Sequence, residues 1–221
     1  MLIGPMCIIF GAGTPPAQPP AIADKDLVIA ADGGYTYALS EGIHADVLIG
    51  DFDSLDASAV EENGSGPLVV RLPKEKDRTD MLAALEYGLE RGFRRLHIYG
   101  GAGGRIDHTL ANVQCLAYLA GRGARGYLHD GDNIVTALRG GLRLAAREHG
   151  VISVFAYGGR AGGVCIRGLK YELENARITC DFPLGVSNEF AGRPVYIGAE
   201  CGVLVVVYPA GTRELEEPQA V

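Results

Sequence analysis

The sequence predicts an α/β protein: an N-terminal, mostly parallel α/β sheet domain followed by an antiparallel β-domain. Two observations carry this prediction. Up to about residue 125, short apolar strands alternate with amphipathic helices, which is typical of a parallel sheet covered on both faces. From about residue 126 onward, short strands follow one another with turn residues between them, and helix signals nearly vanish. That second pattern is typical of an antiparallel β fold.

In the first half, apolar runs ending in turn residues predict strands over 7–10, 27–34, 46–54, 68–73 and 95–101. A helix is predicted over 79–92, because Thr79 suits the N-cap, Asp80 favours the positive helix start and Gly92 suits the end. Its apolar stripe, which we expect to be core, consists of Met81, Leu82, Leu85 and Leu89. A further helix is predicted over 108–123.

In the second half, the expected strands are 125–130, 133–138, 150–158, 163–169, 171–180, 193–199 and 202–209. The last residues, from 211 to 221, have the composition of a frayed acidic tail. We therefore expect an α/β domain over 1–130, a β-domain over 131–213 and a tail over 214–221.

The charge and composition restrict the class of protein. A net charge of −7 argues against a general electrostatic attraction to nucleic acid or to an anionic membrane. No apolar run reaches the roughly 18 residues of a spanning helix, and the first residues lack the basic region of a secretion signal. The five cysteines form no CxxC pair, so we expect reduced thiols in a cytoplasmic protein.

Aspartates gather where the predicted parallel strands end. Asp32, Asp51, Asp53 and Asp107 follow strands, and Asp77 and Asp80 stand at the start of the helix after the fourth strand. Ligands of open α/β sheets bind beyond the carboxyl ends of the strands. One such aspartate usually only caps a turn. Several at one edge predict a Mg²⁺ site, since this cation takes one or two carboxylates together with substrate phosphates.

A glycine-rich stretch supplies the matching anion site. "GGAGGR" (100–105) lies between a strand and a helix, where backbone N–H groups and Arg105 can bind phosphate. It is not a Walker A loop, because no GK[ST] follows. Lys74, Lys76 and Arg78 add cations near the acids. For His108, two interpretations stay open: a general base, or a local hydrogen bond at the helix start.

Six motifs in this order resemble the thiamine pyrophosphokinase (thiamine diphosphokinase) family: "ADGG" (31–34), "GDFDS" (50–54), "KDRTD" (76–80), "GGRIDH" (103–108), "GLKYEL" (168–173) and "GVSNEF" (185–190). The resemblance runs from about residue 7 to 207. It implies that the second domain is a β-sandwich, and that the protein is a homodimer with active sites between its subunits.

The resemblance also implies the reaction: transfer of a pyrophosphoryl group from ATP to the hydroxyl of thiamine, with Mg²⁺, giving thiamine diphosphate and AMP. It assigns catalytic roles to Asp51, Asp53, Asp80, Arg105 and Asp107, with Asp51, Asp53 and Asp80 on the metal. It assigns ATP binding to Asp32, Gly33, Lys76, Asp77, Gly103, Gly104, Arg105 and His108, and thiamine binding to Ser187 and Asn188. Either Asp51 or Asp107 could accept the hydroxyl proton of thiamine.

Two alternatives to this function remain. The first is a Mg²⁺-dependent phosphohydrolase that uses "DFD" as nucleophile and acid, for which a covalent aspartyl-phosphate would be diagnostic. The second is a non-enzymatic nucleotide-binding module with a β partner domain. The sequence departs from the eukaryotic members of the family at one point, because they place a tryptophan near the thiamine ring and this chain contains none.

Overall fold

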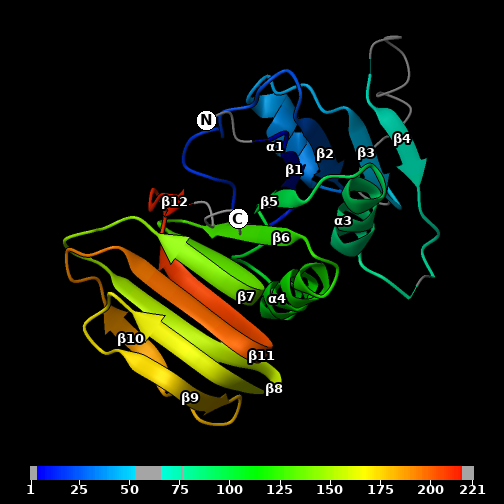
Figure 1. The fold of residues 1–221 in the computed structure, drawn as a ribbon. Coiled ribbons are helices and arrows are strands. Elements are labelled where there is room, and N and C mark those ends of the chain that lie inside the picture. The colour runs from blue at the N-terminus through cyan, green and yellow to red at the C-terminus, as the bar shows by residue number, and fades with distance from the viewer. Residues whose placement is uncertain (1–3, 53–65, 76, 216–221) are drawn as a thin grey trace. The chain divides into compact units, whose positions relative to one another are not determined.

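The computed structural model describes residues 4–52, 66–75 and 77–215. The chain divides into two compact units (Figure 1). The α/β unit comprises residues up to Cys115 together with Gly123–Gly131, and the β unit comprises Leu116–Arg122 together with the residues from Asp132 onward. Each unit has its own pattern of strand pairing: parallel in the α/β unit and antiparallel in the β unit.

The sheet of the α/β unit is parallel. Its strands lie in the order β6-β5-β1-β2-β3-β4, and each neighbouring pair among them runs in the same direction. In chain order the elements are β1 (Cys7–Phe10), β2 (Leu27–Ala31), α1 (Gly34–Ser40), β3 (Val47–Gly50), β4 (Leu68–Arg71), α3 (Asp80–Glu90), β5 (Arg95–Tyr99), α4 (Ile106–Ala120) and β6 (Arg125–Asp130).

Helices cover both faces of this sheet because the central strands are apolar on both sides. All four residues of β1 are buried. Ile8 and Phe10 join a core cluster with Tyr35 and Ala38 of α1. The alternate residue Cys7 faces the other way, toward Gly88 of α3. The carboxyl ends of the strands are left open between these layers, which is where ligands bind in such sheets.

The predicted helix over 79–92 is confirmed as α3. The Oγ1 atom of Thr79 accepts a hydrogen bond from the backbone N–H of Leu82 at 3.1 Å, which is the expected N-cap. Met81 and Leu85 are buried, as the apolar stripe predicted. Gly92 follows the helix end with a φ of +88°, a left-handed conformation that favours glycine.

Two predictions for this unit were wrong in detail. The stretch 27–34 is not one strand, because β2 ends at Ala31 and α1 begins at Gly34. A side chain at position 34 would collide with the carbonyl oxygen of Phe10, so glycine here allows the helix to start against β1. The strand at 125–130 was grouped with the antiparallel pattern, whereas β6 pairs in parallel with β5.

The β unit is antiparallel. Its strands lie in the order β10-β8-β11-β7, with β9 paired to β8 and β12 paired to β7. The strands are β7 (Asn133–Leu144), β8 (Val151–Arg167), β9 (Leu173–Thr179), β10 (Gly185–Glu189), β11 (Val195–Pro209) and β12 (Glu214–Leu215).

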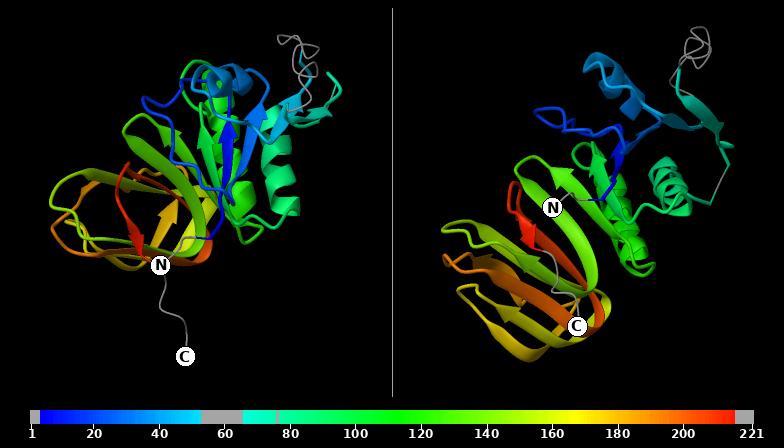
Figure 2. Two further views of the ribbon diagram at one scale, coloured as in Figure 1. Left: turned by 90° about the horizontal axis from the view of Figure 1, so that it is seen from above. Right: turned by 45° about the horizontal axis from the view of Figure 1, so that its top comes forward.

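Two pairs of predicted short strands are single long strands. The stretches 150–158 and 163–169 both belong to β8, and 193–199 and 202–209 both belong to β11. Their pairing shifts register between Cys201 and Val203, opposite Gly162 and Tyr157. The glycines between the predicted strands thus form a β-bulge that bends the ladder without ending it. Figure 2 shows the curved sheet from two directions.

The two ends of the long strands share one core. Its buried side chains come from both halves of β8, including Ile152 and Ile166, and from both halves of β11, including Ile197 and Val206. The predicted tail over 214–221 starts too early, because Glu214 and Leu215 form β12. The hydroxyl of Tyr208 donates to Glu214 at 2.8 Å, which anchors this short strand.

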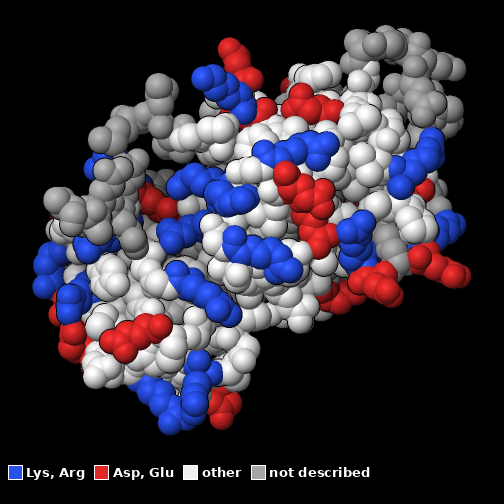
Figure 3. All heavy atoms as spheres, turned by 45° about the vertical axis from the view of Figure 1, so that its right-hand side comes forward, with Lys and Arg blue, Asp and Glu red and all other residues white. Residues whose placement is uncertain are grey.

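Two further observations concern the surface. Among the described residues, no helix is long and apolar enough to cross a membrane. On the face drawn in Figure 3, basic and acidic side chains are interspersed, so no field of one sign covers that face.

Candidate active site

Two glycine-rich loops meet beyond the carboxyl ends of β1 and β5. The loop 11–14 pairs with the loop 100–104 through backbone hydrogen bonds: Gly13 N–H donates to Gly100 O at 2.7 Å, and Thr14 N–H donates to Ala102 O at 2.9 Å. The bond from Gly11 N–H to Tyr99 O, at 2.8 Å, continues the β1–β5 ladder into this contact. The two loops therefore form one interlocked structure.

The close approach of these loops requires glycine. A Cβ at Gly13 would lie 2.7 Å from the carbonyl oxygen of Gly100 and would collide with that of Ala102. Gly103 has a φ of +75°, and a side chain there would collide with the hydroxyl of Thr14. Larger residues at these positions would push the two loops apart, so glycine is needed for their backbones to lie in contact.

Asn112 is hydrogen-bonded to the loop 100–104. It belongs to α4 and is only 5% exposed. Its Nδ2 donates to the carbonyl oxygen of Gly101 at 2.6 Å. Because Gly101 is itself buried, this bond satisfies a polar group that water does not reach.

The interlocked loops, the start of α3 and the start of α4 enclose a pocket of about 610 Å³ within the α/β unit. It brings together several residues that the sequence predicted for ATP binding and catalysis: Asp32, Asp80, Gly103, Gly104, Arg105 and His108. It also contains Gly11, Gly13, Thr14 and Asn112, which sequence reasoning missed. The signal for the first three was present, since "GAGT" follows an apolar strand just as "GGAGG" does. Asn112 left no local signal.

The ends of β2 and β3 carry strained backbone. Asp32 has a φ of +45° and Phe52, within "GDFDS", has a φ of +58°. Asp32 N–H donates to Ile49 O at 2.8 Å, so the ends of β2 and β3 lie side by side. Asp51 comes two residues after Ile49 in the chain. A bulky residue with positive φ is uncommon, and such strain gathers at functional sites.

Arg105 and Asp107 form an ion pair at the N-terminus of α4. Arg105 donates from Nη2 and Nε to the two carboxylate oxygens, at 2.6 and 3.2 Å. These hydrogen bonds hold the pKa of Asp107 below its ordinary value. Both side chains are exposed. A carboxylate with a lowered pKa is a weaker base, so in this arrangement Asp107 is poorly suited to accept a proton.

Other predicted residues lie elsewhere. Gly33, Asp51, Asp77 and Asp107 do not line the pocket, and Asp77 is exposed. Asp53 and Lys76 fall outside the described residues. Within the described ranges, no three His, Cys, Asp or Glu side chains gather closely enough to hold a metal ion. The donor set of the pocket itself, Asp32 and Asp80, matches the one or two carboxylates that Mg²⁺ takes when phosphates supply further ligands.

The two motifs of the β unit lie side by side. Lys170 N–H donates to Glu189 O at 3.0 Å, and the two side chains form an ion pair at 2.7 Å. Asn188 is only 4% exposed, and its amide bonds to backbone: Nδ2 donates to Tyr171 O at 2.6 Å, and Oδ1 accepts from Tyr171 N–H at 3.0 Å. Asn188 therefore joins "GLKYEL" to "GVSNEF".

Ser187 differs from its neighbour. Its side chain is exposed, and its backbone has a φ of +59°, which is rare for serine. Its N–H donates to the hydroxyl oxygen of Ser153 at 3.1 Å, which holds this conformation. Of the two residues predicted to contact thiamine, Ser187 is exposed, while Asn188 is buried and its amide bonds to the backbone of Tyr171.

Comparisons with known proteins agree with these observations. Residues 20–128 match the family model described as "Thiamin pyrophosphokinase, catalytic domain", and residues 142–204 match "Thiamin pyrophosphokinase, vitamin B1 binding domain". The first match covers most of the α/β unit, and the second lies within the β unit.

Individual relatives give the same result. The chain is 28% identical to thiamine pyrophosphokinase of Bacillus subtilis over 83% of this chain and 87% of that protein. It is 25% identical to thiamin pyrophosphokinase 1 of Caenorhabditis elegans over 80% of this chain and 76% of that protein. A crystal structure of the Bacillus subtilis enzyme superposes with a TM-score of 0.81, covering 94% of this chain and 99% of that one. The chain thus belongs to the thiamine pyrophosphokinase family.

Proposed function

We propose that this protein transfers a pyrophosphoryl group from ATP to the hydroxyl of thiamine, giving thiamine diphosphate and AMP. The observation that carries the proposal is the pocket of about 610 Å³ at the strand ends, where glycine loops, an arginine and carboxylates meet. Transfer of a phosphoryl-type group needs positioning and charge stabilisation more than a covalent catalyst. Membership of the family supports the choice of both substrates.

The phosphates of ATP would bind beside the loop 100–104. Gly103, Gly104 and Arg105 line the pocket directly before α4 begins at Ile106. The N-terminus of a helix favours anions, because its first N–H groups and its dipole point toward them. Arg105 can exchange its exposed contact with Asp107 for phosphate oxygens, since the pair is open to solvent.

The carboxylates would serve the metal. Asp32 and Asp80 lie in the pocket, and Asp51 directly follows Gly50, the last residue of β3, which lies beside Asp32. We propose that these residues, with Asp53, hold Mg²⁺ together with the triphosphate. When bound, the cation would neutralise the charge that develops on the transferring phosphates. Either Asp51 or Asp107 could accept the proton of the thiamine hydroxyl, since the ion pair that lowers the pKa of Asp107 would open when Arg105 binds phosphate.

Thiamine recognition is assigned to the β unit. We propose that Ser187 contacts thiamine directly, and that Asn188 acts by fixing the loop that presents Ser187. The match of residues 142–204 to the vitamin B1 binding model supports this assignment. We accordingly propose an ATP- and Mg²⁺-binding domain over 1–130 and a thiamine-binding β-sandwich over 131–215. The bent strands with a shared core support the sandwich.

We further propose that the protein is a homodimer and that it is located in the cytoplasm. Exposed apolar side chains gather before and on β10, with Phe182 64%, Leu184 50% and Val186 42% exposed. Among the described strands, β10 pairs only with β8, so it is an edge strand that a second copy can cover. The five cysteines are free thiols, which suits a reducing compartment.

The test is incubation of the protein with ATP, Mg²⁺ and thiamine, with detection of products by mass. Thiamine diphosphate and AMP in equal amounts are expected. Stoichiometric ADP would exclude pyrophosphoryl transfer and indicate a kinase. Phosphate release with a covalent aspartyl-phosphate would indicate a phosphohydrolase, and unchanged ATP would indicate a binding module.

A further inference from the structure

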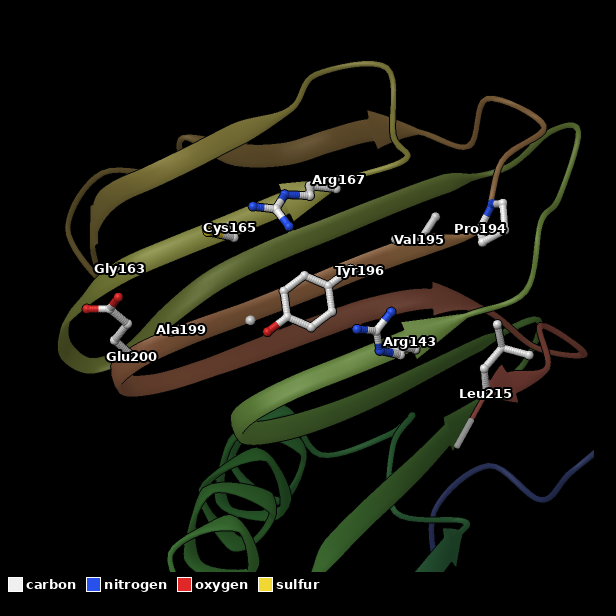
Figure 4. A pocket seen from close by; sticks show the side chains of 11 residues that line it. Arg143, Gly163, Cys165, Arg167, Pro194, Val195, Tyr196, Ala199, Glu200 and Leu215 are labelled. Atoms are coloured by element: carbon white, nitrogen blue, oxygen red, sulfur yellow. The ribbon is translucent and has the colours of Figure 1, made fainter. Parts of the chain in front are cut away.

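The β unit contains a second pocket, of about 570 Å³, which the proposed reaction does not use. Figure 4 shows it on one face of the sheet formed by β8, β11 and β7, with β12 at its edge. The buried neighbours Ile166 and Ile197 point into the core, so alternate residues such as Arg167 and Tyr196 point outward. The pocket is therefore a hollow on the outer face of this sheet.

One row of side chains crosses the hollow in register. Leu215 pairs with Arg143, Arg143 pairs with Tyr196, and Tyr196 pairs with Arg167, on four adjacent strands. Residues directly opposite in a sheet project to the same face. Because adjacent strands lie about 4.8 Å apart, the backbones of Arg143 and Arg167 are roughly 10 Å apart, with the tyrosine between them. Two arginines at this separation can reach one anion.

Glycines keep the hollow open beside this row. A Cβ at Gly198 would lie 2.5 Å from the hydroxyl oxygen of Tyr196, and a Cβ at Gly163 would collide with the side chain of Glu200. The tyrosine and the glutamate therefore lie along the sheet in space that the glycines leave. Figure 4 shows Glu200 at the end of the hollow away from Leu215.

The arginines differ in their partners. Arg167 binds Glu174 through Nη2 at 2.7 Å and Nε at 3.0 Å, which orients its guanidinium and leaves Nη1 outside this contact. The Cζ of Arg143 lies 5.0 Å from the ring centroid of Tyr196. In the part of the chain that the structure describes, no carboxylate forms an ion pair with Arg143. The hollow thus contains one cation held over an aromatic ring and one preoriented by a carboxylate.

We propose that this hollow binds a small molecule through a phosphate or diphosphate group held by Arg143 and Arg167. The planar fork of arginine matches phosphate oxygens. The ring of Tyr196 packs against the guanidinium of Arg143. At the end of the hollow away from Leu215, Glu200 accepts hydrogen bonds from an amino group of the same ligand. The volume falls within the range of small-molecule sites, about 300–1,000 Å³. The residues that line it are all different from those that line the pocket of the α/β unit.

The test uses inorganic pyrophosphate and a readout specific to this site. Cys165, which lines the hollow, is alkylated with iodoacetamide and its peptide is quantified by mass spectrometry. Pyrophosphate should slow alkylation of Cys165 and leave that of the exposed Cys180 unchanged. Arg143→Gln should weaken this protection about tenfold, as expected for the loss of charged hydrogen bonds. Arg143→Lys should recover it only in part, and Arg160→Gln, an exposed arginine on the same strand as Cys165, should leave it unchanged.

The proposal is overturned if pyrophosphate does not protect Cys165, or if Arg143→Gln is as well protected as the parent protein. Equal protection by citrate at the same ionic strength would overturn the assignment to a phosphoryl group. A thermal melt is the check that Arg143→Gln is folded, and Arg167→Gln should give a second, independent loss of protection. AMP formation by Arg143→Gln should stay at the parental rate, so failure of the proposed reaction would be seen separately.

Discussion

The side chain of Asn112 in α4 donates to the carbonyl oxygen of Gly101 at 2.6 Å, and this bond joins the helix to the glycine loop of the candidate active site. The residues around it tolerate little change. A Cβ at Gly101 would lie 2.6 Å from Ile98, 2.7 Å from Leu128 and 3.2 Å from Nδ2 of Asn112, so the loop is packed tightly against all three side chains. The loop that we assign to phosphate binding is therefore positioned by a buried polar side chain, not only by its glycines.

Asn112→Leu should impair ATP use. Leucine keeps the volume but leaves the buried carbonyl of Gly101 without a partner, which costs about 1–3 kcal/mol. We expect a raised KM for ATP and a smaller change in the KM for thiamine. Gln114→Leu, an exposed amide on the same helix, is the matched control. Equal changes in both KM values, at unchanged stability, would show that Asn112 does not position this loop.

Gly13→Ala should separate the two interlocked loops. The new methyl group would lie 2.7 Å from the carbonyl oxygen of Gly100, so backbone must shift. We expect AMP formation to fall and the melting temperature to drop. Gly4→Ala meets open space and serves as the control. Parental activity in Gly13→Ala would mean that the loop contact is dispensable.

Asp51→Asn should abolish most of the activity. The substitution keeps size and shape but removes a charge that we assign to the metal, so turnover should fall roughly 100-fold or more. Stability in EDTA should stay level or rise slightly, because like charges repel in the metal-free site. We expect the same of Asp53→Asn, a position outside the described residues. Asp24→Asn, at an exposed acid, is the control. Lost stability with normal turnover per folded molecule would assign these aspartates a structural role.

Ser187 and Asn188 should give different defects. Ser187→Ala removes an exposed hydroxyl, so the KM for thiamine should rise about three- to tenfold while that for ATP stays constant. Asn188→Ala leaves the backbone N–H and carbonyl of Tyr171 unpaired, so it should lower the free energy of unfolding by about 1–3 kcal/mol. Steady-state kinetics and urea unfolding measure both quantities. Ser40→Ala, which removes another exposed serine hydroxyl, is the control. If it also changed the KM for thiamine, the effect of Ser187→Ala could not be assigned to a contact with thiamine.

Stability should fall at acid pH through two histidines of the α/β unit. His97 Nδ1 and His129 Nε2 lie 3.0 Å apart on β5 and β6. Burial lowers the pKa of His97 to about 3 and that of His129 to about 4. The unfolded chain, with histidine pKa values near 6.5, therefore binds protons first as the pH falls.

The free energy of unfolding therefore rises with pH, from about 3 to 6.5 through His97 and from about 4 to 6.5 through His129. Above about pH 6.5 this loss of stability is absent. At pH 5 each histidine should cost about 2 kcal/mol. His97→Gln should reduce the slope of stability against pH, measured by urea unfolding from pH 4.5 to 7.5. The exposed His44→Gln should not. An unchanged slope in His97→Gln would exclude this pair as its source.

Local features of the sequence determined much of this protein. The apolar runs set β1 to β5, and Thr79 with its apolar stripe set α3, because strand burial and helix capping depend on residues within a few positions of one another. The acids that follow strands and the glycines before α4 could likewise be recognised from residues within a few positions of one another. These patterns predicted the α/β unit and, through six ordered motifs, the family.

Tertiary structure decided what distant segments do together. The interlocking of loops 11–14 and 100–104 joins residues far apart in the chain, so "GAGT" alone predicted only a turn. Nothing in the sequence around Asn188 indicated that its amide bonds to the backbone of Tyr171, because only the fold places "GLKYEL" beside it. The glycines of β8 and β11 predicted strand ends, but pairing across the sheet continues past them. In each case the deciding contact depends on a neighbour that only the folded chain brings within hydrogen-bonding distance.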